Sequence, residues 1–496
     1  MNIKEAKEQI KYALMAYFSK NEYGNYKIPL EKQRPIFLLG APGIGKTAIM
    51  EQIAQELNVG LVSYSMTHHT RQSALGLPKI LKKTYQEEEF EVSRYTMSEI
   101  ISSIYELMEK TGVKEGILFL DEINCVSETL APSMLLFLQY KIFGGHQIPD
   151  GWTIVTAGNP PEYNKFVREF DVVTMDRLKK ITVEPDYSVW KEYAYHQNIH
   201  PVVMTYLDIK KDCFYHMESS IDGKRFVTPR GWEDLSQMIQ LFEELALPVD
   251  EKLIAQYLQD GKIAKDFATY YDLFSKYQSD YQIEEILSGN ISDEIRMRAG
   301  KARFDEKVAL LGLFLDKMAG ETKELLNTQK MLLKLLAILK EVKTGGITGL
   351  EKRISGLEKL LQTGRQAKTL SENDFQISSE LSSILGCYKT MLESGDSFDV
   401  LKENFNDRLK SLKSAASQIG EHFTHLFEFY ETTYANGQEI LLLVTELTVN
   451  EYTSAFISQY GCVKYFEHNQ ELLFHERNKE IIERLNLLEF ETSNII

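Results

Sequence analysis

The chain has 496 residues and a mass of 57.2 kDa, which is too long for one hydrophobic core and predicts two to four domains. Hydrophobic residues make up 43% and charged residues 26%, so intrinsic disorder and fibrous repeats are excluded. The 72 acidic against 56 basic residues leave a net charge of −16, which argues against a protein that coats nucleic acid or an anionic membrane. The four cysteines form no C-x-x-C pair, and no stretch reaches the ~18 apolar residues of a membrane span. A cytoplasmic protein with reduced thiols is therefore expected.

The first third of the chain alternates short apolar runs with helical patterns, which predicts βα units and a parallel sheet. Strands are predicted at 35–39, 61–66, 116–120 and 152–157. Each is nearly all apolar, as in strands covered on both faces, and each ends where a parallel sheet presents its ligand-binding edge. An insert at 67–96, with two extended runs and an acidic tip, precedes helices predicted at 97–110 and 124–140.

The rest of the chain is predicted to be helical. Pieces near 187–197, 201–209, 229–245 and 250–259 indicate a small helical domain over 185–281. Long helices follow over 282–496, with breaks expected at Gly345-Gly346 and Asn436-Gly437. The segment 332–339 is apolar almost all round and is expected to be buried. The α/β part is assigned to 1–184.

The string GAPGIGKT at 40–47 carries the clearest chemistry. It follows the run IFLL and leads into a helical pattern, the context that the phosphate-binding G-x-x-x-x-G-K-[ST] motif requires. Its glycines let backbone N–H groups surround phosphate oxygens at a helix N-terminus. Lys46 should contact the β and γ phosphates, and the Thr47 hydroxyl should bind Mg²⁺. The nucleotide-binding residues assigned here are Gly40, Pro42, Gly43, Ile44, Gly45, Lys46, Thr47 and Ala48.

Two adjacent carboxylates, Asp121 and Glu122, follow the predicted strand at 116–120. Side by side they repel one another unless a cation is present, so Asp121 is assigned to Mg²⁺ and Glu122 to polarising the attacking water. The alternative interpretation is a pair of surface acids at the start of the next helix.

With these motifs the chain resembles the AAA+ ATPases and, within that superfamily, the MoxR family and its dynein-related relatives. The resemblance covers about residues 30–245 and rests on strings in the family's order: GAPGIGKT at 40–47, LFLDEIN at 118–124, TAGNPPEY at 156–163, TMDRL at 174–178 and TPRGWEDLS at 228–236. It implies a P-loop AAA+ parallel-sheet core, a small helical lid and, beyond them, a large helical region. The implied cofactors are ATP and Mg²⁺.

The same resemblance implies roles for three further residues. Asn159 matches the sensor 1 position, with an ordinary turn Asn as the alternative. Arg177 matches the arginine finger that reaches a neighbouring subunit, with Arg168 as its rival and surface salt bridging as the third possibility. Arg230 matches sensor 2 in the lid, and whether it acts on its own nucleotide or the neighbour's is open. The pair His68-His69 in the insert is interpreted as polar loop residues rather than metal ligands.

The function implied by the resemblance is Mg²⁺-dependent ATP hydrolysis by a homo-oligomeric ring, a hexamer, that remodels a protein partner. A von Willebrand factor A domain protein is the implied kind of partner, and the helical region after 282 is expected to dock it or to stabilise the ring. One alternative is a GTPase motor of a restriction or phage-defence complex, but the string GNPPEY after the sensor strand argues against it. The other alternative is a nucleotide-dependent switch of low turnover, and the presence of Glu122 and Arg177 argues against that.

Overall fold

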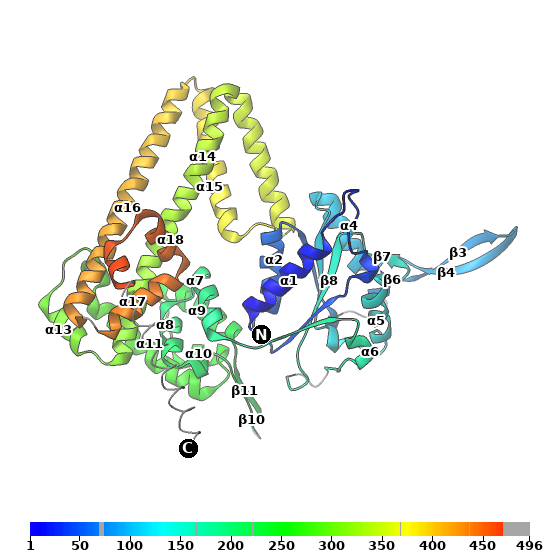
Figure 1. Cartoon of the computed structure of the whole chain (residues 1–496), viewed down its shortest axis with the longest axis horizontal. Helices are drawn as coiled ribbons and strands as arrows, with labels where there is room; N and C mark the ends of the chain where they lie inside the picture. The colour runs from blue at the N-terminus through cyan, green and yellow to red at the C-terminus, as the bar shows by residue number, and fades with distance from the viewer. Residues whose placement is uncertain (69–73, 164–166, 221–222, 368, 436, 470–496) are drawn as a thin grey trace, which may run out of the picture. The chain divides into compact units, whose positions relative to one another are not determined.

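The computed structural model describes residues 1–68, 74–163, 167–220, 223–367, 369–435 and 437–469 (Figure 1). The chain forms two compact units, which are described one at a time. The first unit contains residues 1–189, 228–230 and 344–393, and the second contains 190–227, 231–343 and the residues from 394 on. The predicted domain boundaries at 184/185 and 281/282 stay predictions.

A parallel sheet of five strands forms the centre of the first unit. Its strands are β1 (Ile36–Gly40), β2 (Gly60–Ser65), β5 (Gly116–Asp121), β8 (Trp152–Gly158) and β9 (Lys179–Val183), in the spatial order β2-β5-β8-β1-β9. The four predicted strands are confirmed to within one residue at either end. The fifth, β9, was not predicted, because the sequence KKITV begins with two lysines and buries only alternate residues.

Helices cover this sheet and complete the α/β layer. They are α1 (Ile3–Tyr17), α2 (Lys46–Leu57), α4 (Glu99–Thr111), α5 (Ala131–Tyr140) and the short α6 (Val172–Met175). Apolar side chains of α4 and α5 pack with those of β2, β5 and β8 in one buried cluster. The predicted α/β core followed by a largely helical region is confirmed.

The predicted helix at 124–140 is wrong in its first half. Residues Ile123–Cys125 form one turn of 3₁₀-helix (η3), Val126 is extended, and the α-helix begins only at Ala131. Pro132 explains the later start, because proline lacks an N–H group and fits the first turn of a helix.

Two antiparallel hairpins belong to the described part of the first unit. In the insert, β3 (Pro78–Tyr85) pairs with β4 (Glu88–Tyr95), which confirms the two extended runs (Figure 1). The tight turn between them uses Gln86 and Glu87, both with positive φ. The smaller hairpin joins β6 (Ile142–Phe143) to β7 (His146–Gln147). The side chains of His68 and His69 lie outside what the structure describes.

A pair of helices that comes late in the sequence also belongs to the first unit. The helix α14 (Phe304–Ala367) contains a non-helical break at Gly346, with φ 60° and ψ −152°, as the glycine pair predicted. Residues 344–367 of α14 and the helix α15 (Glu372–Glu393) form what we call the helical arm, residues 344–393. It contacts α2, where the Gln55 side chain donates a hydrogen bond to the Leu370 carbonyl over 3.4 Å.

The part of the second unit that the structure describes consists of helices, their connecting loops and one hairpin. Its elements are α7 (Tyr187–His196), α8 (Pro201–Ile209), β10 (His216–Ser220), β11 (Gly223–Val227), α9 (Pro229–Glu244), α10 (Glu251–Tyr257), α11 (Gly261–Tyr281), α12 (Ile283–Leu287), α13 (Asp293–Lys301), the first part of α14, α16 (Phe398–Tyr434), α17 (Gln438–Val449) and α18 (Glu451–Tyr460). The first residues of α7 and of α9 belong to the first unit. The four predicted helical pieces before 260 are confirmed. The antiparallel hairpin β10–β11 was not predicted.

Aromatic and aliphatic side chains of α14, α16, α17 and α18 form the core of this unit. The expectation for 332–339 is wrong at Leu333, whose side chain is 62% exposed, whereas Leu332, Leu335 and Leu339 are buried. The segment 332–339 is therefore an amphipathic part of α14 that buries one face, and not a helix buried on all sides. No single helix among the described residues has the length and hydropathy of a membrane span, although α17 and α18, bent by 92°, pass that test together.

Candidate nucleotide-binding site

The loop between β1 and α2 has the backbone that a phosphate-binding loop needs. Gly43 and Gly45 have φ of 76° and 91°, in the left-handed region that favours glycine. A Cβ atom on Gly43 would also lie only 2.9 Å from the Thr228 hydroxyl oxygen. The helix α2 begins at Lys46, directly after the second glycine, so its unpaired N–H groups lie at the edge of the loop. Pro42 and the buried Ile44 complete the loop, and Ala48 lies in the first turn of α2.

Lys46 is buried at the centre of the site. Its ammonium donates to the carbonyls of Gly40 and Ala41 over 2.8 and 2.7 Å, and to the Asn159 side-chain oxygen over 2.9 Å. Burial lowers the pKa of Lys46 to about 8, because a charged amine loses its hydration. The Asp121 carboxylate opposes this shift, whereas the Arg230 guanidinium adds to it.

Thr47 and Asp121 bring two hard oxygen ligands together. The Thr47 hydroxyl donates to Asp121 Oδ2 over 3.0 Å, and the other carboxylate oxygen accepts from the Glu122 backbone N–H over 2.8 Å. Thr47 lies in the first turn of α2 and Asp121 at the carboxyl end of β5. A hydroxyl and a carboxylate are the protein ligands that Mg²⁺ takes beside phosphate oxygens. The donor set therefore fits the ion that the sequence predicts.

Glu122 is held in a defined orientation by two hydroxyl groups. Its backbone is left-handed, with φ 55° and ψ 35°, which is uncommon outside glycine and asparagine. Its Oε2 accepts hydrogen bonds from Ser65 Oγ and Thr67 Oγ1, each over 3.1 Å. The sequence analysis missed both hydroxyl residues. The signal for Ser65 was its place at the end of β2, since β2 pairs with β5 and sets Ser65 opposite Asp121.

Asn159 follows β8 and faces Lys46 through its side-chain oxygen. Its backbone carbonyl accepts a hydrogen bond from Asn124 Nδ2 over 2.8 Å. Asn124 packs closely on the end of β8, because a Cβ atom on Gly158 would lie 2.4 Å from Asn124 Oδ1. Asn124 is thus a further residue that positions Asn159, and the sequence analysis gave it no role.

These observations bring Lys46, Thr47, Asp121, Glu122 and Asn159 to one edge of the sheet, and one comparison agrees with them. The family model described as "ATPase family associated with various cellular activities (AAA)" matches residues 36–139. Residues 36–139 form an AAA ATPase domain. The matched segment of this AAA domain contains the loop at 40–47 and the carboxylates of Asp121 and Glu122, and the family binds ATP with Mg²⁺. Comparison of the chain with the curated proteins gave no match.

Arg230 lies beside the loop of its own AAA domain. Its backbone N–H donates to the Gly43 carbonyl over 3.2 Å, and its charge lowers the pKa of Lys46, after the larger effect of burial. Residues Thr228–Arg230 belong to the first unit, although the chain on either side belongs to the second.

The two candidate finger residues are not part of this group. Arg177 is exposed and donates to the Gln139 side chain of α5 over 2.6 Å. Arg168 is exposed as well and forms an ion pair with Glu128. The structure therefore leaves both arginines at the surface of the first unit.

Proposed function

We propose that this protein is an Mg²⁺-dependent ATPase that works as a ring and remodels a protein partner. The ATPase activity is proposed from two contacts beside the loop that follows β1. Lys46 donates a hydrogen bond to Asn159, and Thr47 donates one to Asp121. A buried ammonium, two hard oxygen ligands and an amide at one helix N-terminus fit the charges of a nucleoside triphosphate.

The proposal gives each side chain a separate task. Lys46 binds the β and γ phosphates, and Thr47 and Asp121 hold Mg²⁺, which supplies positive charge to the phosphate oxygens. Glu122 polarises the attacking water, because the bonds from Ser65 and Thr67 fix one of its oxygens and leave the other to accept a proton. Asn159 orients that water from the end of the neighbouring strand.

Arg230 acts on the nucleotide of its own chain in this proposal. Its position beside Gly43 and its effect on the Lys46 pKa support a role in cis. The Arg230 guanidinium lowers the pKa of Lys46, and it would add a second permanent positive charge for the phosphates.

The ring part of the proposal places Arg177 at the nucleotide of a neighbouring subunit. Two exposed apolar residues on α6, Val172 and Val173, support an intermolecular contact here, since they are 85% and 59% exposed just before Arg177 in the sequence. A hexamer in the cytoplasm, with a von Willebrand factor A domain protein as client, extends the resemblance to the MoxR family.

Two substitutions test the ATPase assignment. Lys46→Ala should abolish ATP binding because it removes the phosphate contact. Glu122→Gln should keep binding and lower turnover by about 10² to 10⁴-fold, the usual contribution of a general base. Binding is measured by calorimetry and turnover by phosphate release. Equal loss of ATP affinity in both variants would contradict the assigned roles.

A mixing experiment tests the shared active site. Arg177→Ala protein has an intact pocket and no finger, and Lys46→Ala protein has a finger and no usable pocket. Mixed rings should therefore regain part of the activity that each variant lacks, because a finger of this kind contributes about 10³ to 10⁵ in rate. Native mass spectrometry shows whether mixed rings form. If mixed rings form and stay inactive, while Arg168→Ala protein complements Lys46→Ala protein, the finger is Arg168.

A further inference from the structure

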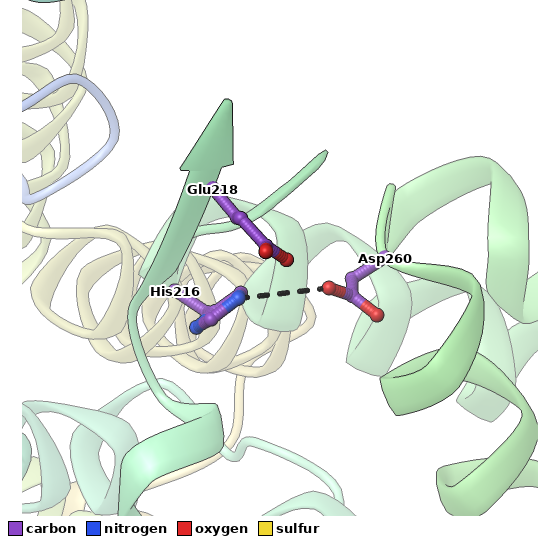
Figure 2. A group of neighbouring side chains, drawn as sticks. All are labelled: His216, Glu218 and Asp260. Carbon is purple, nitrogen blue, oxygen red and sulfur yellow. Dashed lines mark ion pairs between the residues drawn. The ribbon is translucent and has the colours of Figure 1, made fainter. Parts of the chain in front are cut away.

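The second unit contains a group of metal-ligating side chains, none of which belongs to the nucleotide site. His216, Glu218 and Asp260 point toward one another in Figure 2, and their ligand atoms all lie within 4.8 Å of one another. One imidazole nitrogen with two carboxylate oxygens is a donor set that binds first-row divalent ions.

The backbone brings these three side chains together in two ways. His216 and Glu218 stand two residues apart on β10, so the period of a strand places both on one face. The partner strand β11 then forms a bridge to the segment before α11, in which the Phe226 N–H donates to the Gln259 carbonyl over 3.3 Å. Asp260 follows Gln259 directly, and the bridge therefore sets it beside the hairpin.

Asp260 is fixed with one carboxylate oxygen directed at the other two residues. It is 3% exposed and caps α11, since Oδ1 accepts from the N–H groups of Lys262 and Ile263 over 2.9 and 3.2 Å. The other oxygen, Oδ2, lies 3.7 Å from His216 Nε2, which is too long for a hydrogen bond. A cation bound between this carboxylate and the imidazole would pair with the negative charge of the buried Asp260 side chain.

We propose that His216, Glu218 and Asp260 bind one Zn²⁺ ion, with water at the fourth position. Tetrahedral zinc, with bonds of about 2.0 to 2.1 Å, places its ligand atoms about 3.3 Å apart. The two side chains on the hairpin can close the remaining distance by rotating, because both are partly or fully exposed while Asp260 stays fixed. The imidazole selects against Mg²⁺ and Ca²⁺, which prefer sites made of oxygen ligands alone. The ion holds the hairpin β10–β11 to the N-cap residue of α11.

Zinc titration of the metal-stripped, nucleotide-free full-length protein tests this site. Calorimetry should show one tightly bound equivalent of Zn²⁺ and no comparable binding of Mg²⁺. The substitutions His216→Ala, Glu218→Gln and Asp260→Asn should each weaken zinc affinity by at least about 100-fold, the upper end of what the loss of an outer-shell partner costs. Asp260→Asn keeps an amide oxygen that can cap α11, so the fold is preserved.

A matched control and a second readout make the result specific. His196→Ala removes another exposed histidine, paired with Glu451 over 2.8 Å and outside the three-residue group, and it should leave zinc affinity unchanged. Zinc should also slow hydrogen exchange of the Phe226 amide in the wild-type protein and not in Asp260→Asn protein. Absence of a tight equivalent would overturn the proposal. So would a tight equivalent that persists in all three variants.

Discussion

The affinity of the AAA domain for ATP should fall about 10-fold between pH 7 and pH 9. The pKa of Lys46 is about 8 because the side chain is buried, so roughly nine-tenths of these amines are charged at pH 7 and roughly one-tenth at pH 9. Bound phosphates keep the amine charged in the complex. Affinity therefore follows the charged fraction of the free protein, and it is lost as the pH rises through the pKa.

The assay is a titration with a non-hydrolysable ATP analogue and Mg²⁺ at constant ionic strength, followed by calorimetry at several values of pH. Lys46→Arg is the first control, because a guanidinium stays charged across this range and should give a flat, although weaker, profile. Lys141 is the second. Burial lowers its pKa to about 8 as well, but its ammonium donates to the Leu138 carbonyl of α5.

Lys141→Met should therefore leave the pH profile of the wild-type protein unchanged. A wild-type affinity that changes less than 2-fold from pH 7 to pH 9 would refute the reasoning, since Lys46 would then be charged throughout or would not contact the phosphates. If the pH profile became flat in Lys141→Met protein, the titrating group would be Lys141, and the assignment to Lys46 would be wrong.

The remaining predictions concern orientation and stability. The double substitution Ser65→Ala and Thr67→Ala should lower kcat by about 10 to 100-fold with little change in ATP affinity, because Glu122 loses the hydrogen bonds that orient it. A higher kcat in this variant would instead mean that the two hydroxyl groups hold the Glu122 carboxylate away from the attacking water. Lys191→Ala should lower the free energy of unfolding by about 3 to 5 kcal/mol in urea denaturation, because it removes the buried ammonium that lies 2.8 Å from Asp208 and 2.6 Å from Glu446. The exposed ion pair of Lys410 with Asp407 is the control, and Lys410→Ala should leave the free energy of unfolding nearly unchanged.

The sequence by itself determined the parts of the site that depend on local structure. The loop at 40–47 is recognisable because its glycines, its lysine and the flanking strand and helix are neighbours in the chain, and the structure confirms that arrangement. The central strands were predictable because burial on both faces leaves a continuous apolar run. The strand β9 escaped prediction because an edge position relaxes that requirement.

Tertiary structure decided which distant residues meet. Lys46 contacts Asn159 across 113 residues and Thr47 contacts Asp121 across 74, and both contacts depend on the strand order β2-β5-β8-β1-β9. Hydrophobic periodicity shows that a segment is a strand, but it carries no information about which strand lies beside it.

The zinc proposal shows the same division. His216 and Glu218 lie two residues apart on β10 and therefore share one face of the strand. The sequence did not predict that β10 is a strand, so this spacing could not be used. Asp260 joins them only because a backbone bridge between Phe226 and Gln259 holds its segment against the hairpin. Almost every residue can form a backbone hydrogen bond, because all residues except proline carry the same N–H and C=O groups. The sequence therefore does not show where such a bridge forms, and the position of Asp260 follows only from the tertiary structure.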